Sequence, residues 1–279
     1  MVHRIDLRLL GRVRGAGPMN ASGEQILACL HTVASERGQR NQDPVLAACT
    51  AAVKAYQHRR FAQTYADMLG HQRYAGAARF FLEDLYGPGD FTSRDDQFAR
   101  IVPALVKLFP RDIVSTVLAL AQLHALSERL DGAMGRALKD GTAGRALAAR
   151  VDTVAERYGP LWRSVGRPEE REQQIALMLK VGQALEGYTR KPLLRQTLKL
   201  MRGPAQAAGL GALQTFLERG FDTFRQMGGA SEFLAAIAKR ERGLVDELFA
   251  GADAPLLHGA AASTTDAGEQ RHPYDIPRH

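Results

Sequence analysis

The chain has 279 residues, of which 45% are hydrophobic, so it is long enough to bury a core as one large domain or two small ones. Its formal net charge of +7 is a mild excess for this length and does not by itself indicate a nucleic-acid-binding protein. No run of about 18 apolar residues occurs, so we expect no membrane-spanning helix and no membrane partner.

The beginning of the sequence is rich in Arg up to a Gly-Ala-Gly-Pro stretch, and it lacks the apolar core and cleavage site of a secretory signal. We therefore expect residues 1–18 to form a flexible N-terminal extension, and either Met1 or Met19 can be the true start. Residues 251–279 are rich in Ala, Gly, Ser, Thr and Pro and show no periodicity, which predicts a disordered C-terminal tail. The region between them, residues 19–250, is the predicted helical domain.

Helical periodicity fills this region, and strand signals are nearly absent. Asp43-Pro44 predicts a helix N-terminus, and Gly87-Pro88-Gly89 predicts a helix stop. The expected helices begin at Ser22 and then cover about residues 44–69, 72–86, 92–109, 112–138, 143–158, 168–189, 192–201, 205–226 and 231–249. We predict an all-α fold, a single multi-helix bundle of about ten helices. A faint similarity between "TYADMLGHQRYAGAARFF" and "FDTFRQMGGASEFLAAI" leaves open two duplicated helical halves.

Both cysteines, Cys29 and Cys49, lie on alanine-rich apolar segments, without a second pair or a histidine at ligand spacing. Two buried, reduced thiols are typical of a cytoplasmic protein, so we expect that location and neither a zinc site nor a redox motif. The only tryptophan, Trp162, is expected to pack in a connector.

The most distinctive stretch is "FFLEDLYGPGDFTSRDDQF", from Phe80 to Phe98. On a helical wheel Asp84 falls within an apolar arc, where a carboxylate must be paired, hydrogen-bonded or protonated. In a structural interpretation, Asp84 braces the turn with Arg94 or Arg100, and Thr92 or Asp95 caps the next helix.

In a functional interpretation, the same loop presents side chains to a ligand, since binding residues are often carried by loops on a rigid scaffold. The candidate ligand-binding residues are Asp84, Tyr86, Asp90, Arg94 and Asp95.

The stretch "RYAGAARFFLEDLYGPGDFTSRD", followed by "ALSERLD", resembles an uncharacterised bacterial family with the signature RY-x₂-A-x₂-FFL-x-DLYGP-x-DF-x₂-RD. The resemblance covers most of residues 50–250. It implies a bacterial origin and brings no activity with it.

A second candidate is a buried polar centre on the helix at 112–138, where His124, Glu128 and Asp131 continue an apolar face at i, i+4 and i+7. Imidazole and carboxylate groups one turn apart can hold a transition metal. This alternative predicts a metal-dependent helical enzyme, either di-metal or haem-oxygenase-like. The Glu-x-x-His motif of helical di-iron sites does not occur, and a core histidine hydrogen-bonded to a nearby carboxylate is the competing interpretation. Apart from this alternative we expect no cofactor.

A third candidate is a stripe of Lys191, Arg195, Lys199 and Arg202 at helical spacing. Such a stripe can follow a phosphate backbone, although it is also typical of an ordinary solvated helix face. No aromatic residues are interleaved with it to stack on bases.

The leading hypothesis is a cytoplasmic bacterial binding or regulatory protein whose site surrounds the Phe80–Asp95 turn. Its partner is a small molecule or another protein's helix. The sequence contains no Gly-x-x-x-x-Gly-Lys, Gly-x-Ser-x-Gly or His-Glu-x-x-His motif, so whether the protein is an enzyme stays open, as does its oligomeric state.

Overall fold

The computed structural model describes residues 21–85, 87, 89, 91–141 and 151–252, and these form helices and turns without a strand. The predicted all-α fold is confirmed. The expected extension at 1–18 and nearly all of the expected tail lie outside the described residues. None of the helices in the described ranges is both long and apolar enough to cross a bilayer. The elements are α1 (Ala21–Gln42), α2 (Pro44–Thr64), α3 (Ala66–Gly70), α4 (Ala75–Arg79), the π-helix η2 (Phe80–Leu85), α5 (Thr92–Leu108), α6 (Arg111–Asp140), α8 (Val151–Val165), α9 (Pro168–Thr189), α10 (Pro192–Ala207), α11 (Gly211–Met227) and α12 (Ser231–Ala250).

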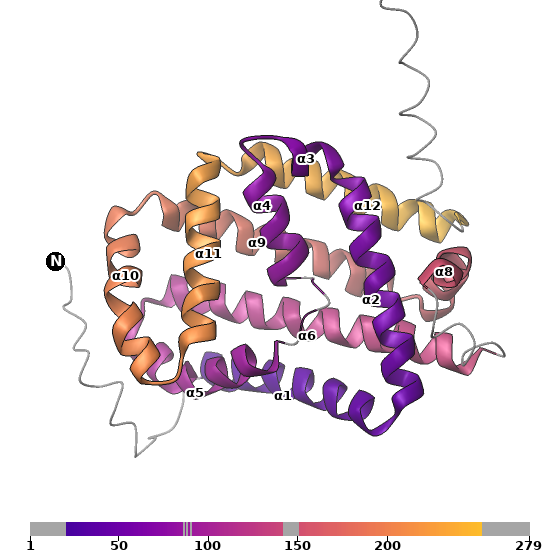
Figure 1. Cartoon of the computed structure of the whole chain (residues 1–279), viewed down its shortest axis with the longest axis horizontal. Coiled ribbons are helices and arrows are strands. Elements are labelled where there is room, and N and C mark those ends of the chain that lie inside the picture. The colour runs from indigo at the N-terminus through magenta and orange to yellow at the C-terminus, as the bar shows by residue number, and fades with distance from the viewer. Residues whose placement is uncertain (1–20, 86, 88, 90, 142–150, 253–279) are drawn as a thin grey trace, which may run out of the picture.

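The 30-residue helix α6 runs through the middle of the molecule and packs against α1, α2, α8 and α9 (Figure 1). Its buried side chains belong to all three hydrophobic clusters: Leu123 to the first, Met134 to the second and Val114 to the third. Helix α6 therefore connects the three parts of the core.

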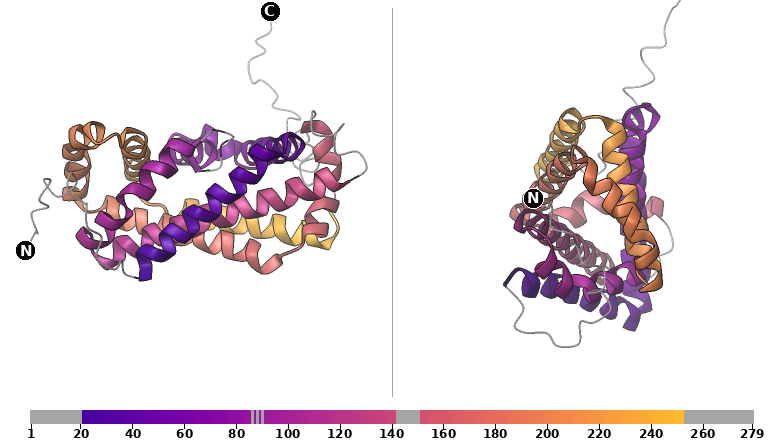
Figure 2. Two further views of the ribbon diagram at one scale, coloured as in Figure 1. Left: turned by 90° about the horizontal axis from the view of Figure 1, so that it is seen from below. Right: turned by 90° about the vertical axis from the view of Figure 1, so that its left-hand side faces the viewer.

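Helices α2, α4 and α11 cross the direction of α6 (Figure 1). Helix α10 packs mainly against α11, and Figure 2 shows this pair, in orange, at one end of the molecule. The other end is occupied by α8, which packs against α2, α6 and α12.

Helix ends that depend on local chemistry follow the prediction. Asp43 caps α2 by accepting hydrogen bonds from the backbone amides of Val45 and Leu46 at 3.1 and 3.0 Å, with Pro44 as the first helical residue. Helix α9 begins at Pro168 and has the predicted bounds.

Three predictions of local structure are wrong. The predicted break between Met201 and Ala205 does not occur, because α10 continues through Pro204 to Ala207, and α11 begins only at Gly211. Helix α8 continues through Pro160 to Val165, so Trp162 lies on a helix, not in a connector. Burial of the Tyr158 and Trp162 side chains stabilises the helix and offsets the loss of the backbone hydrogen bond that Pro160 cannot donate. Likewise Thr92 and Asp95 do not cap α5, because its N-cap is Phe91, which forms no side-chain cap bond, and Asp95 is turned inward.

Candidate functional site

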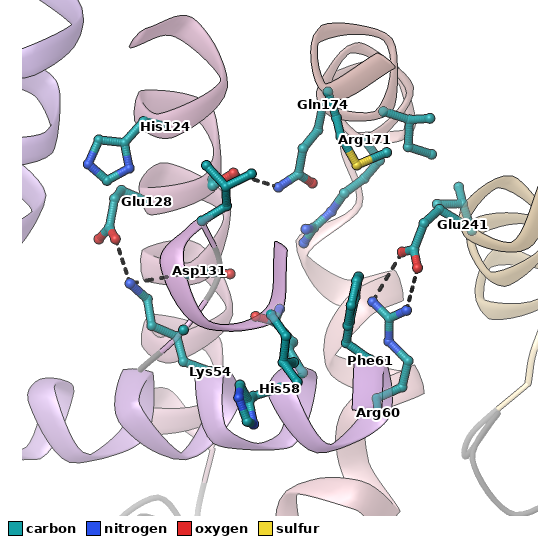
Figure 3. A pocket seen from close by; sticks show the side chains of 18 of the residues that line it. Lys54, His58, Arg60, Phe61, His124, Glu128, Asp131, Arg171, Gln174 and Glu241 are labelled. Carbon is teal, nitrogen blue, oxygen red and sulfur yellow. Dashed lines mark hydrogen bonds and ion pairs between the residues drawn. The ribbon is translucent and has the colours of Figure 1, made fainter. Parts of the chain in front are cut away.

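A cavity of about 110 Å³ lies between α2, α6, α8, α9 and α12. The Phe80–Asp95 segment closes it with Leu82, Leu85, Gly87 and Phe91, while α6 contributes His124, Ser127, Glu128 and Asp131 in a line along one face. The first two regions singled out in the sequence, the Phe80–Asp95 turn and the polar face of α6, therefore meet at one cavity. His124, Glu128 and Asp131 of α6 are labelled in Figure 3.

The wall formed by η2 is a single π-helical turn, with Phe80, Phe81 and Leu82 buried. After it, Gly87 approaches the chain so closely that an added Cβ would collide with the carbonyl oxygen of Glu83. Only glycine fits there without a backbone shift. Isolated π-helical turns often occur at functional sites, because they turn side chains out of the regular helical register.

Glu128 lies at the centre of a buried charge network. Its Oε2 accepts a hydrogen bond from Arg40 at 2.6 Å and its Oε1 from Lys54 at 2.5 Å. Burial alone would raise the pKa of Glu128, but Lys54 and Arg40 outweigh this effect and lower it. Lys54 Nζ also lies 3.9 Å from Asp131 Oδ2. Burial raises the pKa of Asp131 and the charge of Glu128 adds to the rise, although Lys54 opposes it.

His124 is hydrogen-bonded to a carboxylate, as one of the two interpretations predicted. Its Nε2 lies 3.0 Å from Asp95 Oδ2, and Arg37 donates to the same oxygen at 2.8 Å. His124 is thus committed to Asp95, and both oxygens of Glu128 are bonded to cations. Across the described ranges, no group of three or more His, Cys, Asp or Glu side chains is arranged to hold a metal ion.

Arg171 of α9 is the most unusual group in the cavity wall. Its side chain reaches into the space between α2 and α6 (Figure 3), yet the residue is only 3% exposed. The guanidinium carbon lies 3.8 Å from the centre of the Trp162 ring, which partly compensates its burial. Its Nε and Nη2 are buried and have no hydrogen-bond partner among the described residues. Burial lowers the pKa of Arg171, but a guanidinium stays protonated in proteins.

The side of the cavity near α12 carries a closed ion pair. Arg60 of α2 donates to both oxygens of Glu241, at 2.6 and 3.1 Å, and the Tyr65 hydroxyl donates to Glu241 Oε1 at 2.9 Å. These groups form hydrogen bonds with one another. They therefore make this part of the wall rigid and polar rather than offering unpaired donors to a ligand.

Of the residues predicted around the turn, Arg94 contacts both Asp84 and Asp95: it donates to the backbone oxygen of Asp84 at 2.8 Å, and its Nε lies 3.5 Å from Asp95 Oδ1. Asp84 pairs with Arg219 of α11 at 2.9 Å. The prediction that the Asp84 carboxylate pairs with Arg94 or Arg100 is wrong, because Arg94 donates to the backbone oxygen of Asp84 and Arg100 donates to that of Gly209. Both guanidiniums are held by carbonyl groups that the sequence alone does not place. Tyr86 and Asp90 lie outside the described residues.

Asp84 and Arg94 instead line a separate, shallow surface groove. Arg94 is stacked there between Phe91 and Phe216, with centroid distances of 4.2 and 4.6 Å, so it is already engaged. Asp95 lies on the inner side, bonded to Arg37 and His124.

Most of the basic stripe on α10 is paired with acids of neighbouring helices. Arg195 donates to Asp222 at 2.7 Å and Arg202 donates through Nε to Glu218 at 3.0 Å, while Lys191 lies 3.9 Å from Asp112. These pairs reduce the positive charge that α10 offers to a polyanion.

Comparison with known proteins adds a family. The chain matches the family described as Domain of unknown function (DUF8198) over residues 36–255. The chain belongs to this family. The matched span includes every residue that lines the cavity and both ends of the Glu128 network. No curated protein and no solved structure matches the chain.

Four charged residues of this cavity were not predicted from the sequence, although two of them carry a signal. Arg171 precedes Ile175 and Met178 at i+4 and i+7 on the buried face of α9. Glu241 follows Ile237 one turn later on the buried face of α12. A charge within an apolar stripe is the same signal that drew attention to Asp84 and His124. The other two missed residues are Lys54 and Arg60.

Proposed function

We propose that this chain is a binding protein that takes a small molecule into the cavity beneath η2 and Phe91. The observation that carries the proposal is the composition of the wall, where buried charged groups from α2, α6, α9 and α12 surround a space rather than a packed core. Burying such groups is costly, and a site that uses them is a common reason for retaining them.

The volume of the cavity favours a small molecule over another protein's helix. A cavity of about 150 Å³ holds benzene in a different protein, so 110 Å³ suits a molecule of a few non-hydrogen atoms. A helix, with a diameter of about 10 Å, does not fit.

We also propose a bacterial origin and a regulatory role in the cytoplasm. The bacterial origin is supported by the motif at residues 73–95 alone. The cytoplasmic location is supported by Cys29 and Cys49, which are both free thiols.

Trp162 offers a direct test, because it is the only tryptophan and lines the cavity. Titration with a library of single-ring and short-chain fragments is expected to change its fluorescence for a subset of them. Ser127→Leu, which fills the cavity from α6, should abolish these responses. Ser35→Leu, the same change at an exposed position of α1, should leave them intact. Responses that survive Ser127→Leu unchanged would place the binding site elsewhere.

A further inference from the structure

Two other arginines of this chain show how the Nε and Nη2 edge of Arg171 can bind a carboxylate. In two surface pairs of this protein, a guanidinium holds a carboxylate through Nε and Nη2 together: Arg202 with Glu218, and Arg242 with Glu172. In Arg171 the same two nitrogens are buried and lack partners among the described residues. The planar two-donor edge of arginine matches the two oxygens of a carboxylate.

The ion pairs around the cavity leave Arg171 without a bonded carboxylate. The described side chains that line the cavity carry three cations, Lys54, Arg60 and Arg171, and three carboxylates, Glu128, Asp131 and Glu241. Glu128 is bonded to both Arg40 and Lys54, and Glu241 is bonded to Arg60, so neither carboxylate is bonded to Arg171. A monoanion would pair with this one cation, whereas a dianion would bring a second negative charge that the lining does not balance, and an uncompensated buried charge is costly.

Part of the cavity wall is apolar. Ile175 and Met178 follow Arg171 on the same face of α9, and Leu82 and Leu85 of η2 also line the cavity. A molecule whose anionic end meets Arg171 therefore has aliphatic side chains available to contact the remainder of its structure.

We infer that the cavity binds a small monocarboxylate with a short apolar body, whose carboxylate lies on the Nε and Nη2 edge of Arg171. The inference rests on the proposed binding function and names the class of ligand. The Trp162 ring packs against the face of the guanidinium, and the ligand's carboxylate supplies the acceptors that Nε and Nη2 lack.

The experiment uses the full chain and three probes: butyrate, its neutral analogue butyramide, and inorganic phosphate. Trp162 fluorescence and calorimetry report binding. We expect butyrate to bind at least about tenfold more tightly than butyramide or phosphate, because only butyrate offers a single charge-assisted two-point contact together with an apolar chain. Arg171→Met should lower the affinity for butyrate by at least about tenfold. Arg242→Met, which removes an exposed ion pair, should leave this affinity unchanged.

Arg171→Lys adds a second measurement that does not depend on the Met variant folding. It keeps the charge and loses the two-point edge, so butyrate should again bind at least about tenfold more weakly. Equal affinity for butyrate in wild type and Arg171→Lys would overturn the inference, as would tighter binding of phosphate than of butyrate.

The two proposals can fail separately. If butyramide binds as tightly as butyrate and Ser127→Leu abolishes both, the carboxylate assignment is wrong while binding in the cavity stands. If butyrate binds equally to wild type and Ser127→Leu, both the ligand class and the cavity are wrong. If no probe binds but neutral library fragments change Trp162 fluorescence, the carboxylate assignment alone is overturned.

Discussion

Glu128→Ala should lower the free energy of unfolding by about 3–5 kcal/mol, because it leaves Arg40 and Lys54 without their common counterion. Only 9% of the Glu128 side chain is exposed, and the two cations are 14% and 22% exposed, so water replaces the carboxylate poorly. Asp131 compensates little, since it lies 3.9 Å from Lys54 and its burial raises its pKa. Denaturant unfolding at pH 7 measures the loss.

Glu172→Ala is the matched control, because Glu172 and its partner Arg242 are each about half exposed. Its loss should stay below about 1 kcal/mol. The difference between wild type and Glu128→Ala should also narrow in acid. The pKa of Glu128 is lowered in the folded state, so its contribution is present above the unfolded pKa and is lost as the pH falls through the folded pKa. Equal losses in the two variants, or a difference that does not depend on pH, would contradict this account.

The fold was largely predictable because its helices are long and their ends are marked locally. Helix α9 begins at Pro168 with two glutamates in its first turn, and Asp43 with Pro44 begins α2. The prediction failed where tertiary packing outweighs a local signal. Proline normally interrupts a helix, but the buried ring of Trp162 holds α8 together beyond Pro160. The π-helical turn η2 leaves no mark in the periodicity.

The candidate site was predictable in part, through charges on apolar faces. His124, Glu128 and Asp131 were found in this way, and the same criterion applied to α9 and α12 would have added Arg171 and Glu241. Periodicity indicates only which face of its own helix a side chain lies on. It does not indicate which distant helix that side chain contacts. The 2.6 Å pair between Arg60 and Glu241, 181 positions apart, depends on the packing of the whole bundle.

Asp95→Ala should be the second severely destabilising change, with a loss of about 3–5 kcal/mol, whereas Asp84→Asn should cost little or nothing. The carboxylate of Asp95 is 10% exposed and is bonded to Arg37 at 2.8 Å and to His124 at 3.0 Å. Burial opposes its ionisation, but the hydrogen bond and charge of His124, the hydrogen bond from Arg37 and the charge of Arg94 outweigh burial and lower its pKa. Its contribution is therefore present above the unfolded pKa and disappears as the pH falls through the folded pKa.

Asp84 has the opposite electrostatics, although it lies only eleven positions earlier. Its Oδ1 meets the half-exposed Arg219, its Oδ2 is buried without a partner among the described residues, and burial raises its pKa. A raised pKa means that the folded protein loses stability as the pH rises through the unfolded and then the folded pKa. Asp84→Asn removes that penalty and keeps the shape, so its unfolding free energy at pH 7 should equal or exceed that of wild type. Denaturant unfolding of wild type and both variants at pH 3 and pH 7 measures these differences in the free energy of unfolding. If Asp84→Asn were the more damaging of the two at pH 7, then Asp84, and not Asp95, would be the carboxylate that anchors this segment to the bundle.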